Sequence, residues 1–182
     1  MSPDPALKAR TIALVGLMGV GKSTIGRKLA QALELPFRDA DHEIEAAAGR
    51  TIPEIFAERG EAEFRLGERR VIARLLHEPA HVLATGGGAF MDPQTRALMK
   101  EQAVIVWLKA ELDVLARRVG RKANRPLLIG KDPRQVLQQL MEKRDPIYAE
   151  ADIVIETDDR PPGAAVEAIM LALEQRQRAM AE

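Results

Sequence analysis

The chain has 182 residues, enough to bury the core of one domain, and its 27 basic residues balance 27 acidic ones. A net charge of zero disfavours general attraction to nucleic acid or to an anionic membrane. The absence of cysteine excludes a disulfide framework, a thiolate zinc site and a cysteine nucleophile. No segment is apolar enough over the length of a membrane span, and residues 1–10 lack the apolar stretch of a signal peptide. We therefore expect a single cytoplasmic domain with tails at residues 1–10 and about 175–182.

Strand-like apolar runs alternate with helical patterns along the chain. Strands are predicted at residues 11–15, 36–40, 81–85, 104–108 and 153–156. Helices are predicted at residues 22–33, 42–48, 52–59, 61–77, 93–101, 112–120, 133–150 and 164–180. This alternation predicts an α/β fold, with a parallel sheet that has helices on both faces. Ligands of such sheets bind beyond the carboxyl ends of the strands.

A glycine-rich segment, GLMGVGKST, follows the first predicted strand at residues 16–24 and matches G-x-x-x-x-G-K-[ST]. Its glycines allow the backbone amides to surround an anion at the start of a helix. Lys22 would supply a charge to the β- and γ-phosphates, and Ser23 a hydroxyl to Mg²⁺. The strand–loop–helix context disfavours a turn that binds nothing. The residues expected to bind nucleotide here are Gly19, Val20, Gly21, Lys22, Ser23 and Thr24.

Two aspartates, Asp39 and Asp41, follow the second predicted strand. Such a pair near a phosphate loop could position hydrated Mg²⁺ and accept a proton from a hydroxyl group. Alternatively, Asp41 caps the helix that follows. No acidic residue ends the strand at 81–85, so Asp39 is the best available carboxylate for a metal ion that is otherwise held by Ser23 and phosphates.

Three further motifs are open to two interpretations each. In EFRLGE, Arg65 could bind a ligand or pair with Glu68 within one helix. In TGGGAF, the glycines at 86–88 indicate either a close approach to the backbone or a plain turn. In RDPIYAE, Arg144 could join Arg65 in holding a carboxylate, or could simply favour a helix C-terminus.

Residues 121–132, RKANRPLLIGKD, lack helical or strand periodicity and are rich in cations, proline and glycine. We interpret this segment as a mobile lid. Arg125 would then be brought to the transferring phosphoryl group when the lid closes, although a solvated surface arginine is the commoner case.

Taken in order, GLMGVGKST, DAD, EFRLGE, GGGA, NRPLL and RDPIYAE resemble the motifs of the shikimate kinase family over residues 11–173. The resemblance implies a three-layer α/β/α fold of the P-loop kinase type, with a five-stranded parallel sheet and a lid, similar to nucleoside monophosphate kinases. It also implies phosphorylation of the 3-hydroxyl of shikimate by ATP with Mg²⁺, a step towards the aromatic amino acids.

The resemblance assigns roles on the acceptor side. Asp41 would bind the acceptor hydroxyls and act as a base. Arg65 and Arg144 would bind the carboxylate of shikimate. The backbone of Gly87, in the loop Gly86–Gly88, would contact a substrate hydroxyl.

On the donor side, the resemblance implies that Asp39 orients Mg²⁺ through water, together with Ser23. Arg118 and Arg160 would lie near the adenine, and Arg125 would reach the phosphates. The catalytic residues expected are Lys22, Asp41 and Arg125.

Two other functions compete with this interpretation. A gluconate kinase, or a kinase of a related small acid, would also need arginines for a carboxylate. A nucleotide-dependent switch would need an N-K-x-D guanine-binding motif, which the sequence lacks. We therefore expect a monomeric enzyme that binds ATP and shikimate, with no nucleic acid or membrane partner.

Overall fold

The computed structural model describes residues 4–120 and 126–182 and contains a five-stranded sheet in which every neighbouring pair is parallel. The strand order is β2-β3-β1-β4-β5. The strands are β1 (Thr11–Val15), β2 (Phe37–Asp39), β3 (Val82–Ala84), β4 (Ala103–Ala110) and β5 (Ile153–Thr157). The five predicted strands and their parallel arrangement are confirmed.

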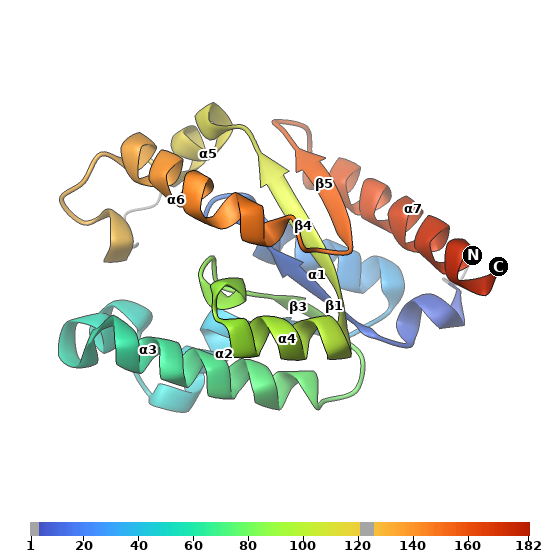
Figure 1. Cartoon of the computed structure of the whole chain (residues 1–182), viewed down its shortest axis with the longest axis horizontal. Helices are drawn as coiled ribbons and strands as arrows, with labels where there is room; N and C mark the ends of the chain where they lie inside the picture. Colours follow the sequence, from blue (N-terminus) through green and yellow to red (C-terminus); the bar gives the residue numbers. More distant parts are fainter. Residues whose placement is uncertain (1–3, 121–125) are drawn as a thin grey trace.

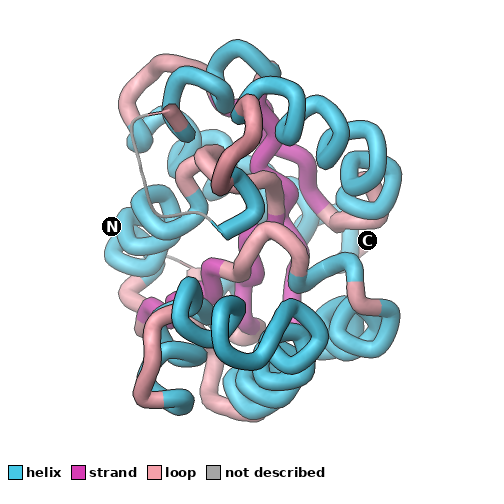
Figure 2. Tube along the Cα trace, turned by 90° about the vertical axis from the view of Figure 1, so that its left-hand side faces the viewer, coloured by secondary structure: helices cyan, strands magenta, loops and turns pink. Residues whose placement is uncertain are grey.

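Helices cover both faces of this sheet, as Figures 1 and 2 show. On one face α1 packs against α7, and on the other α4 lies over β4 (Figure 1). The α-helices are α1 (Lys22–Leu33), α2 (Ala40–Ala48), α3 (Ile52–Leu76), α4 (Pro93–Gln102), α5 (Leu112–Val119), α6 (Pro133–Tyr148) and α7 (Pro162–Ala181). Short 3₁₀ helices are η1 (Pro5–Lys8), η2 (Ala89–Met91) and η3 (Pro126–Leu128). This is the predicted three-layer α/β/α architecture.

The burial of each strand matches its place in the sheet. All five residues of β1, the central strand, are buried, which explains the apolar run that follows Thr11. In β5, at the edge, buried Ile153 and Ile155 alternate with exposed Val154 and Glu156. The core is therefore centred on β1 and its neighbours. The glycine-rich segment at residues 16–21 follows the carboxyl end of β1, at the edge of the sheet.

Helix α3 bends where the sequence predicted a break between two helices. The predicted ranges were 52–59 and 61–77, and Gly60 between them has φ 81° and ψ 172°, outside the helical region. Only glycine adopts this backbone conformation readily. The bend separates the first turns of α3, which begin at a Thr51–Glu54 capping box, from the segment that carries Arg65.

The predicted tails are wrong for much of their length. Pro5–Lys8 forms η1, and Leu7 is buried. Helix α7 continues to Ala181, and Arg176 pairs with Asp152 at 3.0 Å. Tertiary contacts therefore order Pro5–Lys8, where the sequence shows no clear pattern. At the other end, the helix predicted at 164–180 continues through the expected tail. Throughout residues 4–120 and 126–182, each helix is too short or too polar to cross a membrane.

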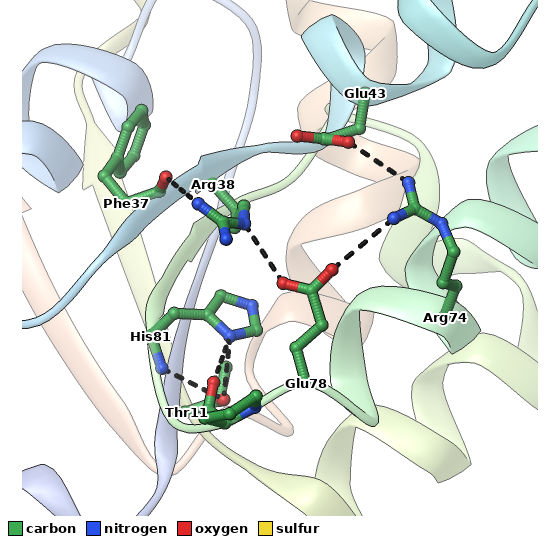
Figure 3. Close-up of polar contacts among 8 residues, drawn as sticks. Thr11, Phe37, Arg38, Glu43, Arg74, Glu78 and His81 are labelled. Atoms are coloured by element: carbon green, nitrogen blue, oxygen red, sulfur yellow. Dashed lines mark hydrogen bonds and ion pairs between the residues drawn. The ribbon is translucent and has the colours of Figure 1, made fainter.

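A chain of ion pairs joins α2, α3 and β2 (Figure 3). Arg74 on α3 contacts Glu43 on α2 at 3.1 Å and Glu78 at 3.4 Å, and Glu78 contacts Arg38 on β2 at 3.1 Å. Exposed pairs of this kind stabilise a fold weakly, by about 1 kcal/mol or less each. Their geometric effect is to hold α2, which follows Asp39, against α3, which carries Arg65.

Candidate active site

The loop between β1 and α1 has the geometry of a phosphate-binding loop. Gly16, Gly19 and Gly21 have φ of 144°, 84° and 99°, values that side chains disfavour. A Cβ at Gly16 would also lie 2.5 Å from the carbonyl oxygen of Leu108 on β4. The loop is therefore packed tightly on the sheet, and α1 begins directly after it at Lys22.

The predicted side chains for phosphate and metal meet at the start of α1. The Lys22 ammonium group donates hydrogen bonds to the carbonyl oxygens of Gly16 (2.7 Å) and Leu17 (3.0 Å), so it lies within the loop. The Ser23 hydroxyl donates to Oδ2 of Asp39 at 2.6 Å. Hydroxyl and carboxylate oxygens are suitable ligands or water partners for Mg²⁺, so these residues fit that ion.

The structure separates the roles of the two aspartates. Asp39 is the N-cap of α2, because its Oδ1 accepts hydrogen bonds from the amides of Asp41 (3.0 Å) and His42 (3.3 Å). The alternative in which Asp41 caps this helix is wrong. Asp41 instead lies in the first helical turn, and its Oδ1 would be 3.0 Å from a Cβ at Gly86. Its carboxylate therefore faces the loop after β3.

Two cavities meet at this carboxylate. The first, of about 570 Å³, is lined by the phosphate loop, Asp39 and the segment after β5. The second, of about 620 Å³, lies between α2, α3 and α6. Both cavities are lined by Met18, Asp41, Gly86 and Gly87. Groups bound in the two cavities would thus face each other across Asp41 and the glycine loop.

Two arginines line the second cavity, and both contact the glycine loop. Arg65 pairs with Glu68 at 2.9 Å, so the predicted pair within the helix does form, yet its guanidinium also faces the cavity. A Cβ at Gly88 would lie 2.6 Å from both terminal nitrogens of Arg65, and one at Gly87 would lie 3.1 Å from Nη1 of Arg144. The consecutive glycines are needed because guanidinium groups approach the backbone here.

Glu68 is a site residue that sequence reasoning treated only as an ion-pair partner. Its side chain is 4% exposed, and its Oε2 has no hydrogen-bond partner among the described residues. Burial raises the pKa of the Glu68 carboxyl, although the neighbouring Arg65 guanidinium acts in the opposite direction. The spacing of Arg65 and Glu68 indicates that they pair, but no local pattern shows that Glu68 is buried beside Asp41.

The remaining predicted residues lie around the first cavity. Arg118 donates to the carbonyl oxygens of Gly19 (3.4 Å) and Val20 (3.3 Å), and so borders the phosphate loop. Arg160 lines the same cavity from the segment after β5, where its exposed side chain pairs with Asp158. Arg125 lies outside the described residues, and its role stays a prediction from the sequence.

A phosphate loop at the carboxyl edge of a parallel sheet, joined to a second cavity with two arginines and a carboxylate, defines a P-loop small-molecule kinase. The family model for shikimate kinase matches residues 18–174. The chain belongs to the shikimate kinase family.

Individual relatives agree with this assignment. The chain is 68% identical over 169 residues to shikimate kinase from Caulobacter vibrioides, covering 93% of this chain and 84% of the relative. Its structure resembles shikimate kinase from Acinetobacter baumannii in complex with shikimate, with a TM-score of 0.89, 41% identity and coverage of 95% and 98%. A gluconokinase from Sinorhizobium meliloti has a TM-score of 0.67 at 18% identity, with coverage of 96% and 97%, and therefore shares the fold alone. The predicted family is confirmed, and the gluconate alternative is not supported.

Proposed function

We propose that this chain transfers the γ-phosphoryl group of ATP to the 3-hydroxyl of shikimate, giving shikimate 3-phosphate and ADP. The observation that carries the proposal is the junction of two cavities at Asp41 and the glycine loop, one lined by a phosphate loop and the other by Arg65 and Arg144. Membership of the shikimate kinase family supports the choice of substrate.

On the donor side, the phosphates of ATP occupy the loop at the start of α1. Backbone amides and the Lys22 ammonium group offset the negative charge that develops on the transferring group. Ser23 and Asp39 are the residues that would hold Mg²⁺ with its water ligands, and the ion would neutralise phosphate charge. The adenine extends towards Arg118 and Arg160, which line the same cavity.

On the acceptor side, the arginines and Asp41 recognise opposite ends of a small hydroxy acid. Arg65 and Arg144 bind the carboxylate through charge-assisted hydrogen bonds, and Glu68 holds Arg65 in place. Asp41 accepts a hydrogen bond from the attacking hydroxyl. The hydroxyl oxygen forms a bond to the γ-phosphorus, its proton passes to the Asp41 carboxylate, and the bond from the γ-phosphorus to the leaving oxygen of ADP breaks. Catalysis depends mainly on positioning these groups.

The proposal is tested by measuring ADP release from ATP and Mg²⁺ with shikimate, with gluconate and without an acceptor. We expect release to be strongly stimulated by shikimate alone, because the chain belongs to the shikimate kinase family and the acceptor cavity holds Asp41 with two arginines. Stimulation by gluconate instead would show that shikimate is the wrong acceptor. Equal ADP release with and without an acceptor would indicate that the chain hydrolyses ATP.

Replacing Arg65 with alanine is expected to raise the KM for shikimate about 10- to 100-fold and to change the KM for ATP less than about threefold. The reason is that Arg65 lines the acceptor cavity and not the phosphate loop. Steady-state kinetics with each substrate varied in turn measure both constants.

Two further variants control this experiment. Arg70→Ala removes an exposed arginine from the same helix and should leave both constants unchanged. Arg65→Ala combined with Glu68→Gln removes the uncompensated buried carboxylate that the single change leaves behind. If the double variant regained a normal KM for shikimate, the effect of the single change would come from Glu68 and the proposed carboxylate contact would be wrong.

A further inference from the structure

Tyr148, the only tyrosine of the chain, is completely buried behind the glycine loop at the end of α6. Its ring packs between Phe90 of η2 and Trp107 of β4, at centroid distances of 6.5 Å and 5.8 Å. Its hydroxyl donates a hydrogen bond to the carbonyl oxygen of Gly87. Tyr148 therefore links α6 to the loop that separates the two cavities.

This bond sets the direction of the peptide between Gly87 and Gly88. In a trans peptide the carbonyl and the following N–H point in opposite directions. Since the Gly87 carbonyl points to Tyr148, the Gly88 N–H points away from it, and Gly88 lines the second cavity. Glycine has little intrinsic preference for one peptide orientation. The hydrogen bond from Tyr148 therefore helps to fix the orientation of the peptide between Gly87 and Gly88.

The same hydroxyl is also linked to Arg144. Arg144 precedes Tyr148 by four residues, so both lie on one face of α6, and the guanidinium interacts with the hydroxyl. Arg144 is itself buried against Gly87. Burial raises the pKa of Tyr148 to about 12, which keeps the hydroxyl protonated and able to donate at any working pH.

We infer that Tyr148 is a positioning residue for the acceptor: its hydroxyl fixes the Gly87–Gly88 peptide and holds Arg144 beside it, so that the loop and the arginine bind shikimate together. This inference rests on the proposed function. It adds a residue that does not line either cavity and acts only through the groups that do.

The test is Tyr148→Phe, which keeps the ring and removes only the hydroxyl. We expect the KM for shikimate to rise about tenfold, because the Gly87 carbonyl loses the donor that fixes the orientation of the Gly87–Gly88 peptide. The KM for ATP should change less than about twofold. Thr11→Val is the matched control, since it removes a buried hydroxyl at the opposite end of the sheet and should alter neither constant.

The outcomes separate this inference from the proposed function. If the unmodified chain is not stimulated by shikimate, the proposed function fails and the inference fails with it. If the unmodified chain is active but Tyr148→Phe has an unchanged KM for shikimate, or raises both constants equally, only the inference is overturned.

A second measurement covers the case in which Tyr148→Phe does not fold. Because the chain has one tyrosine, growth on 3-fluorotyrosine places a single fluorine label at this residue. We expect its ¹⁹F resonance to shift when shikimate saturates the enzyme without nucleotide. A resonance that shikimate leaves unmoved would overturn the inference.

Discussion

Replacing Lys22 with alanine is expected to lower kcat for shikimate phosphorylation about a thousandfold or more. The ammonium group lies inside the phosphate loop, bonded to the carbonyl oxygens of Gly16 and Leu17, where a γ-phosphate would meet it. No other lysine lines either cavity among the described residues, so its charge would not be replaced. Coupled detection of ADP under saturating substrates measures the loss.

Lys28→Ala is the matched control, because Lys28 lies exposed on the same helix. Thermal unfolding of both variants shows whether the loop still folds without the bonds that Lys22 donates to it. Near-normal turnover by a folded Lys22→Ala variant would contradict the assignment of this segment as the phosphate site.

Replacing Asp41 with asparagine is expected to lower kcat between about a hundredfold and ten-thousandfold, while ATP binding changes less than about twofold. The carboxylate lies where the two cavities meet and faces the glycine loop. Asparagine keeps the shape but removes the charge that orients the acceptor hydroxyl. Turnover and calorimetric titration with ATP measure the two effects separately.

Glu43→Gln controls for the loss of a negative charge in the first turn of the same helix. Glu43 pairs with Arg74 away from both cavities, so its substitution should affect stability slightly and turnover little. A marked loss of ATP affinity in Asp41→Asn would move Asp41 from the acceptor to the metal ion.

The amino-acid sequence by itself determined the succession of strands and helices along the chain, the phosphate loop and the family. These features depend on neighbouring residues: the apolar run after Thr11 in β1, the glycines and lysine of residues 16–22, and six motifs in a fixed order. The bend at Gly60 was also predictable, because glycine interrupts a helical pattern locally. The start of α2 was predicted less accurately. The helix was expected from residue 42 but begins at Ala40, because Asp39 caps it.

Only the tertiary structure decided how the site residues divide their work. The sequence alone does not distinguish the roles of Asp39 and Asp41. In the structure, Asp39 caps α2 and accepts a hydrogen bond from Ser23, whereas Asp41 lies at the junction of the two cavities. Glu68 is buried, and Tyr148 donates a hydrogen bond to Gly87. Both features depend on residues that are far apart along the chain. These contacts form because α3 and α6 pack beside the glycine loop, which follows β3 at the carboxyl edge of the sheet. Local patterns do not encode that packing, since it arises only when the helices have docked on the paired strands.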